Sequence, residues 1–241
     1  MLGIGPMSVA SARRVAMVSG ANRGIGAAIA TRLSAEGWSL SLGVRSPDAQ
    51  RDPPKGYDTL VHGYDARDRG SERRWVDATA ERFGRIDAVV ANAGILIPKS
   101  VIEAGDSEID DVFEVNVKAP MRLVRAAWPW LTAAKCGRVI NIVSLSGKRV
   151  ASAKSGLYAT SKFAALALTH AIRQSGWDQG VRATAICPGY VATSMAAAAP
   201  GKPEDLTQPE DIGRIVAFAL DLPNTASVAE IPINWTVEAA L

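Results

Sequence analysis

Residues 14–26 read Arg-Val-Ala-Met-Val-Ser-Gly-Ala-Asn-Arg-Gly-Ile-Gly, and this stretch decides the fold that we expect. Its first part, Arg14–Ser19, is an apolar run of the length of a buried strand. Glycines follow in the spacing Gly-x3-Gly-x-Gly, directly before a helical period that opens with small residues. Glycine permits a tight turn and a close backbone approach, so N–H groups at the start of the helix can bind a phosphate. The stretch predicts a strand, a phosphate-binding turn and a helix, although such a turn on its own also occurs in flexible loops.

Beyond this unit, short apolar runs alternate with longer helical periods, which is typical of a parallel sheet with crossover helices. The expected strands are Arg14–Ser19, Ser39–Val44, Thr59–Tyr64, Ala88–Ala91, Arg138–Val143, Arg182–Cys187 and Val228–Ile233. The expected helices are Ile25–Glu36, Arg69–Phe83, Ile109–Ala134, Leu157–Ser175 and Pro209–Leu220. This alternation of about seven strands predicts an α/β fold with three layers, a doubly wound parallel sheet of the Rossmann type.

No internal repeat or low-complexity linker divides the chain. We therefore expect a single domain over residues 13–241, preceded by a flexible tail at residues 1–12. With 241 residues, of which 48% are hydrophobic, the chain can bury a substantial core. Two segments are expected to be surface loops, because Pro47–Lys55 is rich in proline and charge and Ala196–Pro203 is rich in alanine.

The composition argues against several classes of function. The 27 basic and 24 acidic residues leave a net charge of +3 without long blocks of one sign, so we expect no nucleic-acid partner. Cys136 and Cys187 are far apart, and His62 and His170 have no neighbouring ligands, which argues against disulfides and a metal site. No apolar stretch reaches the roughly 20 residues of a spanning helix, and the N-terminus has no long apolar segment of the secretory kind. We expect a cytoplasmic protein without a membrane partner.

The end of the second expected strand bears on the form of the nucleotide. A dinucleotide site commonly places an acidic residue there for the ribose 2′-hydroxyl, but this chain has Val44 and Arg45. Arg23 and Arg45 can converge on a 2′-phosphate through charge-assisted bonds, so NADP(H) is favoured over NAD(H). The alternative is that either arginine is only a solvated surface charge. Asp65, just after the third strand, can accept a hydrogen bond from the adenine amino group or can cap a helix.

Residues 158–162 read Tyr-Ala-Thr-Ser-Lys and lie within an expected helix. Positions i and i+4 share a helix face, so the Lys162 ammonium can lie beside the Tyr158 hydroxyl. A nearby cation favours tyrosinate and lowers the pKa of the phenol from its usual value of about 10, which makes it a proton donor for neutral pH. The pair alone is weak evidence, because a solvated lysine over a packed tyrosine is common in helices.

Together these motifs resemble those of the short-chain dehydrogenase/reductase family in its single-domain form, over residues 14–235. The matching positions are Gly20, Gly24 and Gly26, the segment Asn92-Ala93-Gly94, Asn116, Ser144, the pair Tyr158 and Lys162, and the run Pro188–Thr193. The departures are Ser19 where threonine is common, Ala91 where asparagine is common, and the lack of a glycine pair near the C-terminus. The resemblance implies the strand order 3-2-1-4-5-6-7 and a homodimer or homotetramer formed through the helices at 109–134 and 157–175.

Hydride transfer to a carbonyl builds charge on its oxygen, so the site needs a proton donor and a group that holds the oxygen. The resemblance implies Tyr158 as the donor and Ser144 as the holding group. Ser146 is a rival, but Ser144 precedes a glycine by three residues, as the family's serine does. Lys162 is implied to bind the nicotinamide ribose besides lowering the pKa of Tyr158. Asn116 is implied to bend its helix and fix a water that links Lys162 to solvent, and the alternative is a buried structural asparagine.

The expected cofactor-binding residues extend along much of the chain. They are Gly20, Asn22, Arg23, Gly24, Ile25, Gly26, Arg45, Asp65, Asn92, Ala93, Gly94, Tyr158, Lys162, Pro188, Gly189, Val191 and Thr193. The Pro188-Gly189 turn can hold the backbone against the nicotinamide ring. Thr193 can bind the carboxamide, although a threonine there can also be an ordinary helix cap.

We predict an NADP(H)-dependent oxidoreductase that interconverts a ketone or aldehyde and an alcohol, with the proton supplied by Tyr158. The expected substrate-facing residues are Ser144, Ser146, Tyr190 and Met195, with Ser194–Lys202 as a lid. Because the lid is mostly alanine, a small or medium apolar carbonyl compound is favoured. The alternatives are an NAD(H)-dependent alcohol dehydrogenase, an imine or enoyl reductase, an epimerase, and a non-catalytic nucleotide-sensing protein on the same fold.

Overall fold

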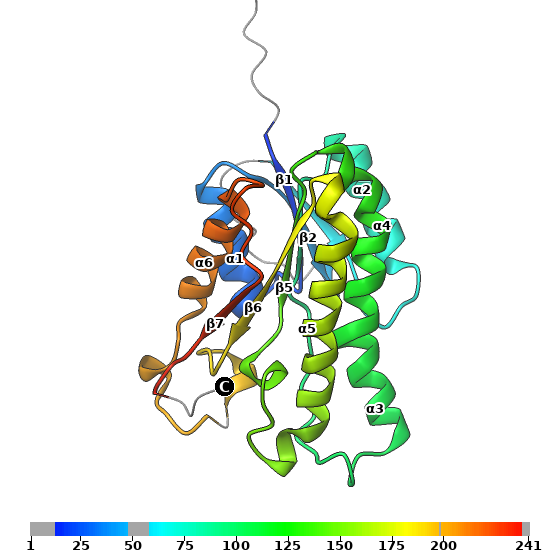
Figure 1. The fold of residues 1–241 in the computed structure, drawn as a ribbon. Coiled ribbons are helices and arrows are strands. Elements are labelled where there is room, and N and C mark those ends of the chain that lie inside the picture. Colours follow the sequence, from blue (N-terminus) through cyan, green and yellow to red (C-terminus); the bar gives the residue numbers. More distant parts are fainter. Residues whose placement is uncertain (1–12, 48–57, 198, 238–241) are drawn as a thin grey trace, which may run out of the picture.

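A parallel sheet runs through the centre of the molecule (Figure 1). The computed structural model describes residues 13–47, 58–197 and 199–237, so the predicted tail and all of the predicted loop Pro47–Lys55 except Pro47 lie outside the described residues. Within these ranges the sheet has seven strands in the order β3-β2-β1-β4-β5-β6-β7, which confirms the predicted fold and strand order. The strands are β1 (Val15–Ser19), β2 (Ser39–Val44), β3 (Thr59–Gly63), β4 (Ala88–Ala91), β5 (Arg138–Ile142), β6 (Arg182–Pro188) and β7 (Glu230–Ile233).

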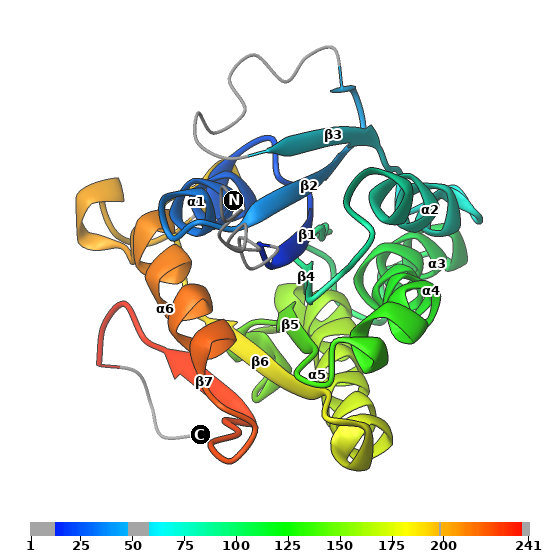
Figure 2. The same ribbon diagram turned by 90° about the horizontal axis from the view of Figure 1, so that it is seen from above.

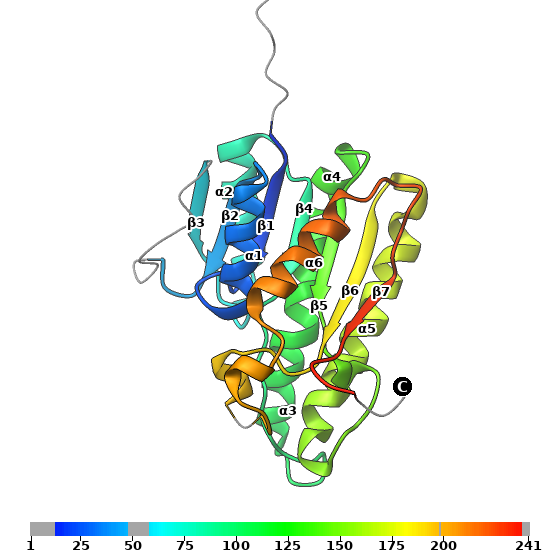
Figure 3. The same cartoon turned by 90° about the vertical axis from the view of Figure 1, so that its left-hand side faces the viewer.

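Helices cover both faces of the sheet (Figure 2, Figure 3). They are α1 (Gly24–Ala35), α2 (Ser71–Phe83), α3 (Asp106–Phe113), α4 (Ala119–Ala133), α5 (Gly156–Gly176) and α6 (Pro209–Asp221). Helices α1 and α6 pack against each other on one face, and α2, α4 and α5 cover the other. Among the described residues, none of the helices combines the length and apolar character needed to cross a bilayer.

The stretch predicted as one helix, Ile109–Ala134, is interrupted in the structure. A wide π-helical turn at Glu114–Lys118 joins α3 to α4. Pro120 has no N–H to offer the carbonyl of Asn116, four residues before it, so the regular α-helical ladder cannot continue there. The helix therefore changes its winding at Asn116, the residue at which the sequence predicts a bend.

The remaining element boundaries lie within one or two residues of the prediction. The largest shift in a strand is in β7, which starts at Glu230 and not at Val228. This strand is at the edge of the sheet, where β6 is its neighbour in the described part of the chain, so fewer hydrogen bonds define its start.

Apolar cores lie on both sides of the sheet, because a parallel sheet is buried on both faces. Ile29 of α1 and Val216 of α6 belong to one core, and Trp75 of α2 and Leu123 of α4 belong to the other. Full burial of each such aliphatic side chain stabilises the fold by about 1.5–3 kcal/mol. Trp75 packs on Gly43 of β2, where a Cβ would lie 2.6 Å from the indole ring, so this packing requires glycine.

The carboxyl ends of the parallel strands meet at one edge of the sheet. The glycine turn follows β1, the Asn92-Ala93-Gly94 segment follows β4, Ser144 follows β5, and Pro188 ends β6. The topology thus gathers four motifs that are far apart in the sequence. Open α/β sheets bind their ligands at this edge.

Candidate active site

A cavity of about 470 Å³ opens at the carboxyl edge of the sheet. Its wall contains every predicted cofactor-binding residue, the predicted substrate-facing residues Ser144, Ser146, Tyr190 and Met195, and the predicted catalytic residues Ser144, Tyr158 and Lys162. Of the described residues of the predicted lid Ser194–Lys202, only Ser194–Ala196 lines the cavity. The fourth predicted catalytic residue, Asn116, lies behind the wall and is buried. The volume is typical of a small-molecule or cofactor site.

The glycine turn after β1 has a backbone that other residues do not fit. Gly20 and Gly24 have positive φ angles of 65° and 52°. A Cβ at Gly26 would lie 2.2 Å from the Gly20 carbonyl oxygen. The N-terminus of α1 has no side-chain cap and no acidic residue in its first turn, so its N–H groups and helix dipole favour an anion. The turn therefore fits the pyrophosphate of a dinucleotide.

The Asn92-Ala93-Gly94 segment is fastened to the end of β1. The Asn92 side chain donates to the Ser19 carbonyl at 2.8 Å. The Ser19 hydroxyl accepts from the backbone N–H groups of Asn92 (2.9 Å) and Ala93 (3.0 Å). Ser19 stood out in the sequence only as a departure from the family pattern, yet its hydroxyl joins two loops of the cavity.

Two arginines and an aspartate stand at the predicted adenosine end of the cavity. Arg23 and Arg45 are exposed, and neither side chain has a hydrogen-bond or ion-pair partner within the described ranges. Asp65 is half-buried, and its carboxylate accepts from the backbone N–H of Arg67 at 3.0 Å. The N-cap of α2 is Gly70, without a side-chain cap, so Asp65 shapes its own turn and does not cap that helix.

Ser144 and Tyr158 come together from β5 and α5. The Ser144 hydroxyl accepts from the Ser146 N–H (3.0 Å) and donates to the Pro188 carbonyl (3.3 Å). Burial raises the pKa of Tyr158 to about 12, and a hydrogen bond with Ser144 opposes part of that rise. Ser144, and not its rival Ser146, is thus the serine that interacts with the phenol.

Lys162 lies one helical turn beyond Tyr158 and is buried with it. Its ammonium donates to the Ile142 carbonyl at 2.9 Å and lies 5.6 Å from the centroid of the Tyr158 ring. Burial lowers the pKa of Lys162 to about 8. The expected lowering of the phenol pKa is not found, because burial dominates and the ammonium is directed at the Ile142 carbonyl.

The Asn116 side chain fixes the chain that follows the Asn92-Ala93-Gly94 segment. Its Oδ1 accepts from the Ile95 N–H and its Nδ2 donates to the Ile95 carbonyl, both at 2.9 Å. The same Nδ2 donates to the Ser161 hydroxyl at 3.0 Å, and Ser161 donates to the Tyr158 carbonyl at 2.7 Å. Asn116 thereby joins one wall of the cavity to the helix that carries the tyrosine and lysine.

Gly147 allows the turn after Ser144 to pack directly against α5. A Cβ at Gly147 would lie 2.8 Å from the Lys162 carbonyl oxygen. The close approach explains why a glycine stands three residues after the serine. This contact with α5 fixes the turn that carries Ser144 close to Tyr158, although the two residues are fourteen positions apart in the sequence.

Thr193 lies over the glycine turn. Its methyl carbon would be 3.1 Å from a Cβ at Gly24. Its side chain makes no cap hydrogen bond to the short helix Ser194–Ala196, so the alternative of an ordinary helix cap is not supported. The preceding Val191 forms a parallel bridge to Thr207, which fixes this strand-like segment at the cavity.

The predicted substrate-facing residues Tyr190 and Met195 are 44% and 49% exposed at the cavity. The Tyr190 ring meets the Trp235 ring edge to face, with centroids 6.0 Å apart. The wall also contains Arg149, Ala151, Ser152 and Ser155, which sequence reasoning missed. Their position between the serine and the tyrosine is the signal that would have found them. The polar side chains of Arg149, Ser152 and Ser155 argue against a purely apolar pocket.

Comparison with known proteins identifies a family that shares this fold. A family model described as short chain dehydrogenase matches residues 14–204. The chain belongs to the short-chain dehydrogenase/reductase family.

Related sequences include proteins named as a reductase and as an oxidoreductase. Agropine synthesis reductase of Rhizobium rhizogenes is 38% identical over 218 residues, which cover 89% of this chain and 50% of that protein. The chain thus spans about half the length of that relative. Oxidoreductase UcpA of Escherichia coli O157:H7 is 32% identical over 224 residues, covering 90% of this chain and 84% of the relative.

Solved structures of similar fold include proteins with a bound phosphorylated dinucleotide. An alcohol dehydrogenase from the archaeon Thermococcus sibiricus, complexed with 5-hydroxy-NADP, has a TM-score of 0.84 and 30% identity over 92% of this chain and 96% of its own. A short chain dehydrogenase from Burkholderia cenocepacia J2315, in complex with NADP, has a TM-score of 0.85 and 28% identity over 93% and 97% of the two chains.

Proposed function

We propose that this protein is an oxidoreductase that uses NADP(H) to interconvert a ketone or aldehyde and the corresponding alcohol, and that reduction is its direction in the cell. One observation carries the proposal. Ser144, Tyr158 and Lys162 line the same cavity as the glycine turn whose backbone fits a pyrophosphate. When bound, the nicotinamide supplies the hydride to the carbonyl carbon.

In this proposal Tyr158 is the acid and Ser144 holds the oxygen. As the carbonyl is reduced, negative charge develops on its oxygen, where the Ser144 hydroxyl donates a hydrogen bond. Tyr158 then gives its phenolic proton to that oxygen. The high pKa of the phenol keeps it protonated at neutral pH, so the donor form is fully populated before reaction.

Proton donation leaves a tyrosinate, which a neighbouring cation stabilises. Lys162 supplies that cation, because its ammonium is largely charged at pH 7 with a pKa of about 8. Its second role in the proposal is to bind the nicotinamide ribose. We further propose that Asn116 positions this wall of the site, and its predicted water link from Lys162 to solvent remains a prediction.

The preference for the 2′-phosphate rests on Arg23 and Arg45. Both guanidinium groups line the cavity without a carboxylate partner among the described residues, and Val44 occupies the place of the usual acidic residue. Guanidinium groups bind phosphate through paired, charge-assisted hydrogen bonds. The NADP and 5-hydroxy-NADP in the two structural relatives support the same choice.

A comparison of NADPH with NADH tests the cofactor assignment. We expect kcat/KM to be higher with NADPH, and Arg45→Gln to lower it about tenfold with NADPH while sparing NADH. The carbonyl substrate comes from a screen of aldehydes, ketones, quinones and sugars, with imines and enones run beside them. A tenfold or greater preference for NADH contradicts the proposal.

Replacing the proposed acid tests the reaction. Tyr158→Phe removes only the hydroxyl, and we expect it to lower kcat about 10²- to 10⁴-fold, the usual contribution of a general acid. Calorimetric binding of NADPH to the variant is the control for an intact site. A variant that oxidises NADPH as fast as the parent with an accepted carbonyl shows that another group donates the proton.

The remaining assignments are a single domain over residues 13–241, a homodimer or homotetramer, and a cytoplasmic location. The exposed Met121 on α4 and Phe163 on α5 support association through those helices. Gel filtration that finds only a monomer contradicts the oligomer.

A further inference from the structure

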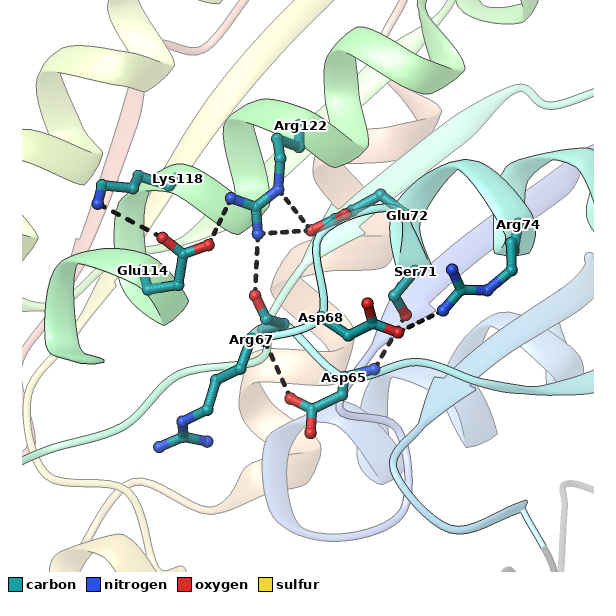
Figure 4. Close-up of polar contacts among 10 residues, drawn as sticks. Asp65, Arg67, Asp68, Ser71, Glu72, Arg74, Glu114, Lys118 and Arg122 are labelled. Atoms are coloured by element: carbon teal, nitrogen blue, oxygen red, sulfur yellow. Dashed lines mark hydrogen bonds and ion pairs between the residues drawn. The ribbon is translucent and has the colours of Figure 1, made fainter. Parts of the chain in front are cut away.

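A cluster of charged side chains lies behind the adenosine end of the cavity (Figure 4). The Arg122 guanidinium, on α4, donates from Nε to Glu72 of α2 (3.0 Å) and from Nη1 to Glu114 (2.6 Å). Its Nη2 donates to the backbone carbonyl of Ala66 at 2.9 Å. The side chains of Arg122, Glu72 and Glu114 are only 17%, 3% and 14% exposed. Three separate parts of the chain thus meet at one arginine.

The charges of this cluster persist although they are largely buried. Burial by itself raises the pKa of Glu114, but hydrogen bonds from Arg122 and Lys118 hold it below its ordinary value. Burial lowers the pKa of Arg122, and its bonds to the two glutamates more than reverse this. A buried ion satisfied by several charged hydrogen bonds is held firmly in place.

One end of the cluster is the wall of the cavity. Ala66 belongs to the short segment Asp65–Arg67, whose residues all line the cavity. Arg67 is itself held by a bidentate ion pair to Asp111 of α3, at 2.7 and 2.8 Å. This part of the wall is therefore fastened from behind at two successive residues.

The other end of the cluster is the turn that carries Asn116. Glu114 is the first residue of the π-helical turn Glu114–Lys118. Within that turn, Asn116 holds the backbone of Ile95 in another part of the cavity wall. Single π-helical turns inside helices are frequent at functional sites. Arg122 therefore connects the wall segment Asp65–Arg67 to the π-helical turn that carries Asn116.

We propose that Arg122 is a positioning residue for the cofactor, which holds the Asp65–Arg67 wall against the π-helical turn and so shapes the pocket for adenosine. The proposal rests on the nucleotide site of the proposed function. Arg122 does not line the cavity and acts through the Ala66 carbonyl. Lysine cannot replace it, because one ammonium cannot reach three acceptors spread around a planar guanidinium.

Calorimetric binding of adenosine 2′,5′-bisphosphate to the full chain tests this role without catalysis. Arg122→Lys keeps the positive charge and loses the bond to Ala66, so we expect Kd to rise about fivefold, the effect of one lost hydrogen bond. The KM for NADPH rises by a similar factor, while kcat stays within about twofold. Arg125→Lys, at an exposed arginine of the same helix, is the matched control and leaves both constants unchanged.

An unchanged Kd in Arg122→Lys overturns the proposal, and so does an equal rise in Arg125→Lys. A loss of kcat without a change in KM also overturns it, because that result marks general damage. Glu114→Gln weakens the same anchor with little change of shape, and we expect a Kd about twofold higher. If Arg122→Lys does not fold, an unchanged Kd in Glu114→Gln overturns the proposal.

Adenosine 5′-monophosphate separates this proposal from the proposed function. If the parent binds it as tightly as the bisphosphate, the preference for a 2′-phosphate fails. Weaker binding of both nucleotides to Arg122→Lys then still supports the positioning role.

Discussion

The glycine turn at Gly20–Gly26 and the segment Tyr190–Ala196 both border the cavity, but they are constrained in different ways. In the turn, φ angles and the 2.2 Å approach to a Gly26 Cβ leave no room for other residues. In the second segment, the side chains of Tyr190 and Met195 are nearly half exposed. The cofactor end is defined by backbone geometry, and the substrate end by exposed side chains.

The largest effect is expected at the substrate end, from the serine that interacts with Tyr158. Ser144→Ala removes the group that we propose holds the carbonyl oxygen and should lower kcat about 10²- to 10³-fold. Ser146→Ala should stay within about threefold, because its hydroxyl is not the one that interacts with Tyr158. Steady-state rates with NADPH and an accepted carbonyl measure both. If both variants lose activity equally, the contact with Tyr158 does not identify which of the two serines holds the carbonyl oxygen.

The next effect concerns Lys162, which lies between the two ends. Its pKa is about 8 in the folded chain and about 10.4 in an unfolded one, so the unfolded chain binds more protons between these values. Folding stability therefore rises with pH in that window. Relative to Lys162→Met, the parent should gain up to about 3 kcal/mol from pH 8 to pH 10.5. Urea unfolding at several pH values measures this difference. If the free energy of unfolding depends on pH in the same way in both proteins, the pKa of Lys162 is not lowered by folding.

A smaller effect is expected from the backbone of the cofactor end. Gly26→Ala places a Cβ against the Gly20 carbonyl, and the displaced turn should raise Kd for NADPH at least about tenfold. Gly63→Ala is the control, because a Cβ there meets its nearest atom at an ordinary 3.7 Å. Calorimetry measures Kd for NADPH in both variants. Normal binding by Gly26→Ala means that the turn adapts and the cofactor end is less rigid than its backbone indicates.

The fold and the positions of the chemical groups could be predicted because each follows from local pattern. Apolar runs alternate with helical periods along the whole chain, and parallel order then brings the strand ends together. The interruption at Asn116 was not predicted as a π-helical turn, because it depends on how Pro120 is accommodated in a long helix. The predicted direction of the Tyr158 pKa shift was wrong, because spacing places Lys162 nearby without saying that the phenol is buried and that Ile142 accepts the hydrogen bond of Lys162.

Contacts between distant residues were the part that the sequence could not supply. The Ser19 hydroxyl binds Asn92 and Ala93, 73 and 74 residues further along the chain. Arg122 meets Glu72 and Ala66 across separations of 50 and 56 residues. No short motif reports such a contact, because each partner alone is an ordinary polar residue.

The seating of Gly147 on α5 has an evolutionary consequence. Because the turn rests directly on the Lys162 carbonyl, the loop that connects this turn to α5 starts and ends at points that are already fixed. Under the proposed function, we therefore expect that changes in residues 148–155 alter which molecules enter while Ser144, Tyr158 and Lys162 keep their places. Evolution or protein engineering can therefore change this loop while the residues of the proposed active site stay the same.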